Sequence, residues 1–107
     1  MTNPEPPKPF DIVELLVSLP EHNLFVGAQG AILEQYSNDD FEVEFSNEAG
    51  ETLVLCTLPR QKFIVVWQSA TQQWLTAAEK VTDILSQLPE PQQEEILNYA
   101  RLIYQKA

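Results

Sequence analysis

The sequence predicts a mainly β fold with a C-terminal α segment, and three observations lead to this prediction. Up to Trp67, apolar and polar residues alternate with period two, which places them on opposite faces of β-strands. Short clusters of Gly, Pro, Asn and Asp interrupt the alternation, as turns do. From Trp74 onward the apolar residues recur at helical spacing. A chain of 107 residues, 44% of them hydrophobic, suffices for one small packed domain with a helical appendage.

The first nine residues are predicted to be a disordered, proline-rich arm. Their prolines lack amide donors and favour extended, solvated backbone; these are Pro4, Pro6, Pro7 and Pro9. The functional alternative is a ligand for an aromatic groove, but the P-x-x-P pattern with its flanking base is unconvincing. The arm lacks the apolar segment of a secretory leader.

Five strands are expected between Phe10 and Trp67. They cover residues 11–19, 30–36, 41–45, 52–58 and 63–67. In the first strand four apolar residues share one face: Val13, Leu15, Val17 and Leu19. The third strand has the cleanest alternation, with three residues expected to point inward (Phe41, Val43 and Phe45) and two outward (Glu42 and Glu44).

The segments between the strands have the composition of turns. Residues 37–40 and 46–50 are polar, and the prolines at positions 20 and 59 end strands. Turn geometry is the expected reason for Gly27 and Gly30. Five short strands with a glycine-bearing first loop and tight later hairpins predict a small SH3-like barrel over residues 10–67. A flat meander is the alternative, and it would leave longer edges to protect.

The tail, residues 74–106, is predicted to be a helical hairpin. Thr76-Ala77-Ala78-Glu79 is a capping box, and the first helix then has an apolar stripe made of Val81, Ile84, Leu85 and Leu88. Pro89-Glu90-Pro91 separates the helices. The second helix has acids near its start and Arg101 and Lys106 near its end, as the helix dipole favours. More than half of its circumference is apolar, so we expect this helix to contact the barrel, the preceding helix and another chain, either a partner or a second copy.

Composition mainly excludes function classes. A net charge of -10, from 16 acids and six bases, provides no basic footprint for direct nucleic-acid binding. No apolar run approaches the roughly 20 residues that span a bilayer, so no membrane association is expected. The single cysteine, Cys56, excludes an internal disulfide and fits a cytoplasmic location. One cysteine and one histidine are too few for a tetrahedral N/S metal site in one chain, and no cofactor is expected.

An ordered set of short motifs runs through residues 10–67. It consists of Asp11-x-Val13-x-Leu15, Leu19-Pro20-Glu21-His22-x-Leu24, Gly27-x-x-Gly30, Glu34, Phe41-Glu42-Val43-Glu44-Phe45, Gly50, Thr52 and a closing apolar strand. With these motifs the segment resembles a small bacterial family known as domain of unknown function 4926, although Ala31 stands where that family usually has a β-branched residue. The tail between Ile84 and Tyr99 resembles helical segments of some bacterial antitoxins. The resemblance implies a small barrel without assigned catalytic residues, often associated with toxin–antitoxin gene pairs, that acts by binding protein.

The carboxylates are the main candidate site. Glu42 and Glu44 share a strand face, Glu34 lies on the neighbouring strand, and Asp39 and Asp40 lie at the turn. Acid–base catalysis needs two different environments, whereas an alternating strand offers two similar, solvated ones. No calcium-binding loop motif is present, so no metal is expected to bind. A solvated outer face and a docking patch for a basic partner remain the two interpretations.

Two other groups of residues carry weaker signals. A nucleophilic pair of Cys56 and His22 lacks an orienting third group and an oxyanion hole, so a structural thiol and a loop imidazole are favoured. The aromatic residues Phe25, Tyr36, Trp67 and Trp74 are candidates for a peptide-binding platform. For the two tryptophans, anchoring of the tail on the barrel is favoured instead.

The predicted function is a non-enzymatic protein-binding module, antitoxin- or immunity-like, that masks a basic partner protein. The candidate partner-binding residues are Asp39, Asp40, Glu42 and Glu44 on the barrel and Tyr99 and Ile103 on the tail. An SH3-like accessory subunit of a larger bacterial complex is the alternative, and an acidic-site hydrolase is a third, weaker hypothesis.

Overall fold

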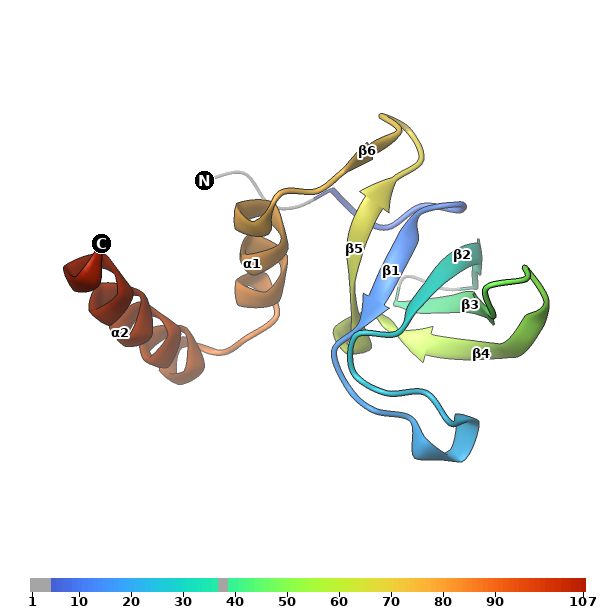
Figure 1. Cartoon of the computed structure of the whole chain (residues 1–107), viewed down its shortest axis with the longest axis horizontal. Coiled ribbons are helices and arrows are strands. Elements are labelled where there is room, and N and C mark those ends of the chain that lie inside the picture. Colours follow the sequence, from blue (N-terminus) through green and yellow to red (C-terminus); the bar gives the residue numbers. More distant parts are fainter. Residues whose placement is uncertain (1–4, 37–38) are drawn as a thin grey trace.

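The computed structural model describes residues 5–36 and 39–107, and in it six strands form one antiparallel sheet (Figure 1). The strands are β1 (Ile12–Leu15), β2 (Gln29–Gln35), β3 (Asp40–Ser46), β4 (Thr52–Pro59), β5 (Phe63–Gln68) and β6 (Gln73–Trp74). Their order in the sheet is β4-β3-β2-β1-β5-β6. Two 3-10 turns, η1 (Pro20–His22) and η2 (Arg60–Lys62), precede β2 and β5, and the helices α1 (Ala77–Ser86) and α2 (Glu90–Lys106) follow the sheet.

The sheet differs from the predicted five-stranded closed barrel. It has six strands, and among the strands described β4 and β6 each pair with one neighbour, so the sheet is open. The additional strand arises because Gln73 and Trp74 turn back and pair with Gln68 and Trp67. The predicted first strand is also shorter, because the chain leaves the ladder after Leu15 and reaches η1. Leu19 nevertheless remains buried, since it forms an isolated bridge with Leu24.

The predicted alternation of β3 is confirmed. Phe41, Val43 and Phe45 are at most 2% exposed, whereas Glu42 and Glu44 are half-buried on the other face. The inward residues pack in a core with side chains from β1, β2, β4 and β5 and from the loop before β2; this core contains Val13, Leu15, Leu19, Leu24, Ile32, Leu58, Phe63 and Val65. Phe41 and Phe63 meet edge to face, with ring centroids 5.5 Å apart. The core therefore joins the first and last long strands to the central hairpin.

Gly30 lies within β2, so the turn-geometry explanation is wrong for this residue and holds only for Gly27, whose φ is +94°. Gly30 is buried beside the last part of β3, next to the point where Ala31 pairs with Glu44. A Cβ atom at this position would lie 2.8 Å from the Glu44 carbonyl oxygen and from Val43 Cγ1. Glycine is present because the two backbones approach too closely for a side chain.

We expect Gly30→Ala to lower the free energy of unfolding by about 1–3 kcal/mol, as in other overpacked cores. The clash is with a backbone oxygen and a packed valine, and neither is the flexible end of a long side chain. Urea denaturation of the variant and the parent measures the change. An unchanged midpoint would show that β2 and β3 can move apart to accommodate the added methyl group at no cost in stability.

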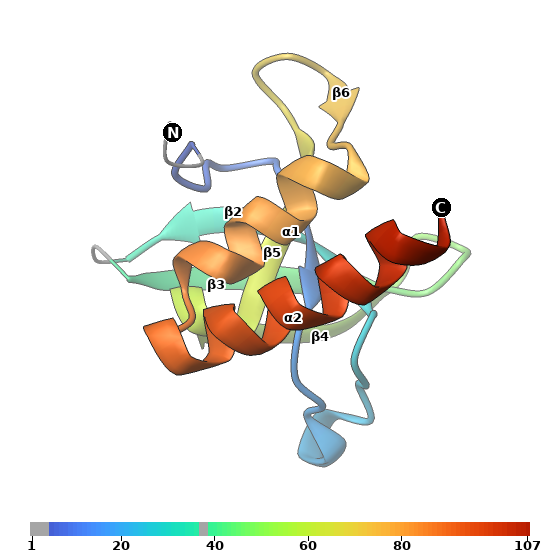
Figure 2. The same cartoon turned by 90° about the vertical axis from the view of Figure 1, so that its left-hand side faces the viewer.

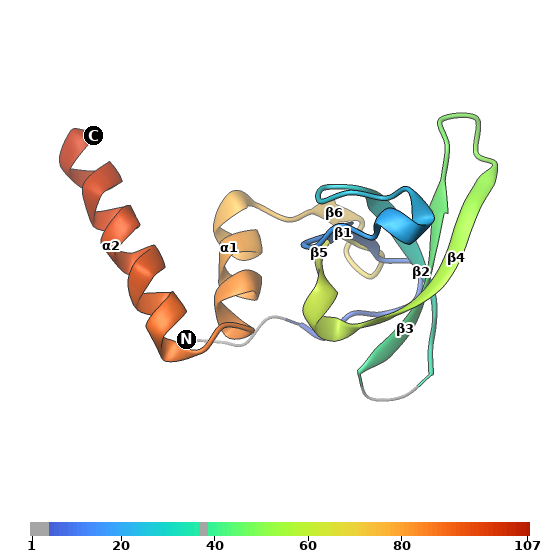
Figure 3. The same ribbon diagram turned by 90° about the horizontal axis from the view of Figure 1, so that it is seen from below.

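Helix α1 packs on the sheet beside β5, and α2 lies on the far side of α1 (Figure 1, Figure 3). The expected packing of the second helix on the barrel is therefore wrong, because α1 occupies the position between α2 and the sheet. The predicted capping box is confirmed: Thr76 Oγ1 accepts from the Glu79 amide at 3.2 Å, and Glu79 Oε1 accepts from the Thr76 amide at 2.9 Å. Hydrogen bonding to that amide lowers the pKa of Glu79. Within residues 5–36 and 39–107, no helix combines the length and apolar character needed to cross a membrane.

The N-terminal segment is attached to the sheet through Asp11, which is 3% exposed. Asp11 Oδ2 accepts from the Lys8 amide at 3.0 Å, and Oδ1 accepts from the Ser69 amide at 2.8 Å and from the Ser69 hydroxyl at 2.9 Å. One carboxylate thus joins the end of the predicted arm to the turn after β5. Pro7 is buried, and the first four residues of that arm lie outside the described residues.

Candidate functional site

The predicted carboxylates lie on the outer face of β2 and β3 and at the turn between these strands. Asp40, Glu42 and Glu44 follow one another at alternate positions of β3, so they share that face. In the register of the sheet Glu42 lies opposite Glu34 of β2 and Thr57 of β4. We call this surface the acidic face; it consists of Glu34, Asp39, Asp40, Glu42 and Glu44.

A β-bulge decides the composition of the acidic face. The β2–β3 register shifts between Ile32 and Glu34, so Leu33 has no Cα partner on β3 and Glu34 is placed opposite Glu42. Like charges directly opposite each other across a sheet are destabilising. The fold therefore maintains a concentration of negative charge at some cost in stability. The alternation of β2 alone does not reveal this bulge.

Neighbouring side chains hold both central carboxylates. The Thr52 hydroxyl donates to Glu44 Oε2 at 2.7 Å. A hydrogen bond to Glu42 raises the pKa of Tyr36, because the bond stabilises the protonated phenol. In both contacts the carboxylate acts as the hydrogen-bond acceptor, so its neighbour orients it.

The two aspartates lie at the end of the acidic face nearest η2. Both are exposed, and Asp40 is opposite Pro59 in the register. The Arg60 amide donates to the Asp39 carbonyl oxygen at 2.8 Å, which ties the β2–β3 turn to the start of η2. Ser37 and Asn38, the first half of the predicted polar turn, lie outside the described residues.

Exposed leucines border the acidic face on β4. Leu53 is 60% exposed and Leu55 is 53% exposed, and Leu55 lies opposite Glu44. Both faces of β4 are rich in apolar residues, so the sequence alone does not show which of its leucines point outward. The register with β3 places Leu55 on the outer face, opposite Glu44. The candidate site is thus a mixed surface of carboxylates and exposed aliphatic groups.

The two predicted tail residues lie at the other end of the molecule. Tyr99 and Ile103 are on α2, 66% and 53% exposed, and α2 is separated from β3 and β4 by α1 and the rest of the sheet (Figure 1). The structure therefore brings the four predicted acids together and leaves the two predicted anchors on a separate surface.

The residues with nucleophilic or metal-binding chemistry do not extend the site. Cys56 is half-buried against the core, and burial together with the charge of Glu21 raises the pKa of its thiol. The neutral thiol that results is a poor nucleophile. Within the ranges that the structure describes, no three side chains of His, Cys, Asp or Glu gather as metal ligands would.

Trp67 and Trp74 form a cross-strand pair between β5 and β6, with ring centroids 6.5 Å apart and an interplanar angle of 60°. The Leu75 amide donates to the Val66 carbonyl oxygen just beyond this pair. The pair thus lies at the point where the chain leaves the sheet for α1, as expected of residues that anchor the tail.

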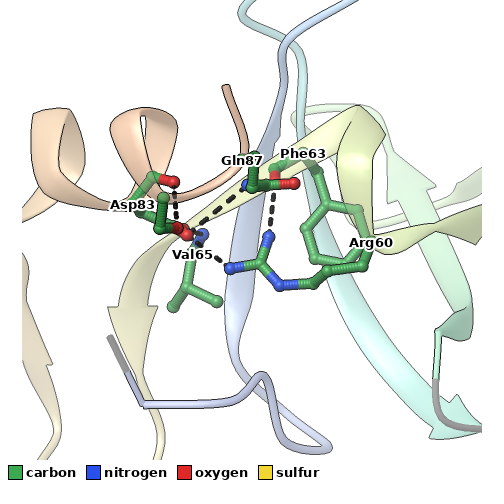
Figure 4. A network of polar contacts seen from close by, with 6 residues as sticks. Arg60, Phe63, Val65, Asp83 and Gln87 are labelled. Atoms are coloured by element: carbon green, nitrogen blue, oxygen red, sulfur yellow. Dashed lines mark hydrogen bonds and ion pairs between the residues drawn. The ribbon is translucent and has the colours of Figure 1, made fainter. Parts of the chain in front are cut away.

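A polar network that the sequence analysis missed attaches α1 to the sheet (Figure 4). Asp83 is 2% exposed, and its Oδ1 is 2.5 Å from Arg60 Nη2. The Val65 amide donates to Asp83 Oδ2 at 3.4 Å, and Arg60 Nη1 donates to the Phe63 carbonyl oxygen at 2.8 Å. The Gln87 amide lies against both charged groups.

This network adds a buried charge beside the predicted apolar stripe of α1, in which Ile84, Leu85 and Leu88 are half-buried. The residue of α1 that is buried is Asp83, whereas Val81, in the predicted stripe, is 45% exposed. No local pattern identifies Asp83, because its partner Arg60 is 23 residues away in the sequence. The network is structural: both of its charges are already paired, so neither serves as a free site for a ligand.

A family model described as "Domain of unknown function (DUF4926)" matches residues 10–65. The match begins just before β1 and ends in the middle of β5. No curated protein and no solved structure matches the chain. The matched segment contains the whole acidic face and excludes both helices.

Proposed function

Since the chain belongs to the DUF4926 family, whose description names no activity, we propose from its geometry that it is a non-enzymatic module that binds a basic protein through the acidic face. The observation that carries the proposal is the opposed pair of Glu34 and Glu42, beside Glu44 and the exposed leucines of β4. Negative charge that costs stability is expected where a positive partner compensates it. The leucines provide apolar area at the same surface.

The scaffold that we propose is an SH3-like barrel. The strand order supports it, because the first four strands follow one another across the sheet and β5 returns beside β1. Register shifts in the β1–β5, β2–β3 and β3–β4 ladders support it as well, since bulges bend strands and allow a short sheet to curl. On such a scaffold the acidic face is an outer surface, with Phe45 and Val43 beneath it.

The charge distribution supports docking on the sheet. Through Trp67 the chain has 11 acids and three bases, and beyond it five acids and three bases. Arg60, one of the first three bases, is paired with Asp83 of α1 and does not offset the acidic face. A basic partner is therefore steered toward β2 and β3, and such steering speeds association.

Removal of the charge is expected to slow association with the partner. In the variant Asp39→Asn, Asp40→Asn, Glu42→Gln, Glu44→Gln, we expect the association rate at low salt to fall about tenfold or more, with little change in dissociation. The association rate of the variant should also depend less on salt concentration, because fewer charges remain to be screened. Affinity purification with the parent chain as bait isolates the expected basic partner, and stopped-flow mixing with that protein measures both rates.

The matched control removes four exposed carboxylates outside the acidic face: Glu5→Gln, Glu21→Gln, Glu48→Gln and Glu51→Gln. It has the same net charge as the test variant, so it separates the local effect from that of total charge. Equal association rates and salt slopes for the two variants would contradict docking on the acidic face.

We propose an antitoxin- or immunity-like role, in which the module masks a toxic basic partner. Co-expression tests it: the parent chain should rescue growth, and the fourfold acidic-face variant should rescue it less. An accessory subunit of a larger complex is the second candidate, favoured by the exposed apolar residues of α2. A stoichiometric assembly without any effect on toxicity would favour the subunit role.

A further inference from the structure

Helix α2 projects from the molecule with its apolar residues uncovered. Its exposed large apolar side chains are Leu97, Tyr99, Leu102, Ile103 and Tyr104, between 43% and 83% exposed, and none of its residues is buried. The radius of gyration is 15.0 Å, against about 13 Å for a compact chain of this length. Figure 2 shows α2 in front of α1, on the side away from the sheet.

Only the start of α2 is attached to α1. Gln93 Nε2 donates to the carbonyl oxygens of Leu85 and Leu88, at 2.8 and 3.0 Å, and so caps the end of α1. Beyond this point the two helices diverge (Figure 3). The face of α2 that is turned away from Gln93 therefore remains open to another chain.

One stripe on that open face is complementary to itself. Glu95, Tyr99, Leu102 and Lys106 are spaced by four, three and four residues, which places them in one line along the helix. An acid is at one end of the line, a base is at the other, and the apolar pair lies between them. When a second copy of the line is placed antiparallel to the first, Glu95 faces Lys106 and Tyr99 faces Leu102 at the same time.

From this arrangement we infer that α2 binds the α2 of a second copy of the chain, in an antiparallel homodimer with its two-fold axis between Ala100 and Arg101. A two-fold interface is self-complementary, so each contact between residues i and j occurs twice. Each dimer thus has two Glu95–Lys106 contacts and two Tyr99–Leu102 contacts. Ile103, which is 53% exposed, lies beside the line and widens its apolar part.

Area and charge both fit a second copy. The chain exposes 7388 Å², against roughly 6,100 Å² for a compact monomer of 12.2 kDa, and a standard interface removes about 800 Å² from each partner. The acidic faces lie at the ends of the molecule far from α2 (Figure 1), so their mutual repulsion is screened at distances beyond about 10 Å in 0.1 M salt.

Charge reversal in the full-length chain tests this interface and its direction. Sedimentation velocity from about 1 µM to about 200 µM should show a monomer–dimer equilibrium for the parent. We expect Glu95→Lys and Lys106→Glu each to weaken dimerisation about tenfold at low salt, and the double reversal to restore it. In a parallel pair, Glu95 would face Glu95, so neither single reversal would weaken the dimer and the inferred arrangement would be overturned.

Two matched controls separate the line from the rest of α2. Tyr99→Ala should raise the dimer Kd more than tenfold, whereas Tyr104→Ala, the same change off the line, should alter it less than about threefold. Glu94→Lys adds the same charge as Glu95→Lys about 100° around the helix and should have little effect.

A parent chain that remains monomeric at the highest concentration would overturn the inference. The partner of α2 would then be a different protein. This inference does not rest on the proposed function. The fourfold acidic-face variant should dimerise as the parent does, so failure of one proposal leaves the other intact.

Discussion

Asp83→Ala is expected to lower the free energy of unfolding by about 3–4 kcal/mol, the lower part of the range for breaking a buried ion pair. The variant leaves the Arg60 guanidinium without its carboxylate partner. This charge is largely buried, because the Arg60 side chain is only 17% exposed. The Val65 amide also loses its acceptor. Urea denaturation followed by circular dichroism measures the change, and hydrogen exchange along α1 shows whether that helix separates first.

A double-mutant cycle with Arg60→Ala isolates the pair itself. We expect the double variant to lose less free energy of unfolding than the sum of the losses in the two single variants, because it leaves no unpaired charge. Glu48→Gln, which removes an exposed carboxylate from the β3–β4 loop, is the control and should change stability by less than about 0.5 kcal/mol. Additive single effects would mean that Asp83 and Arg60 act independently, contrary to the network in Figure 4.

Phe45→Ala is expected to cost about 3–5 kcal/mol, because it leaves a cavity in a core with little freedom to collapse. Phe45 is 1% exposed and lies where Gly30 allows β2 to approach β3, so the backbone on that side is already in close contact. Thermal and urea unfolding of the variant measure the loss.

The matched control for Phe45→Ala is Phe25→Ala, the same chemical change at a loop residue that is 57% exposed. Its effect should stay within about 0.5 kcal/mol. If both variants unfolded at the parent's midpoint, the inward orientation of Phe45 would be wrong. Comparable losses in both would indicate that Phe25 has a structural role in the β1–β2 loop.

Local patterns in the sequence determined two features: which face of β3 is buried and where α1 begins. The alternation of Phe41, Val43 and Phe45 with two glutamates predicts the buried and outer faces of β3, and Thr76 with Glu79 predicts the start of α1. Family membership was also predictable, since its motifs occur in order through the sheet. These features are accessible because each depends on residues only a few positions apart.

Alternation predicts burial more reliably than it predicts hydrogen-bonded pairing. Leu19 was placed on the buried face correctly, but the chain leaves the ladder after Leu15, so the predicted first strand was too long. Trp74 was expected just before the helix, and it also pairs with Trp67 as part of a sixth strand. A two-residue strand has no periodicity of its own to detect.

Tertiary structure alone decided the features that depend on partners distant in the sequence. The bulge at Leu33 places Glu34 opposite Glu42, and the close approach of β2 to β3 requires Gly30. The ion pair with Arg60 makes Asp83 the buried residue of α1. It also decided that α2 stands away from the sheet with Tyr99 exposed. The physical reason is that register, close approach and ion pairing depend on which segments meet in space, whereas periodicity only records which side of each segment is apolar.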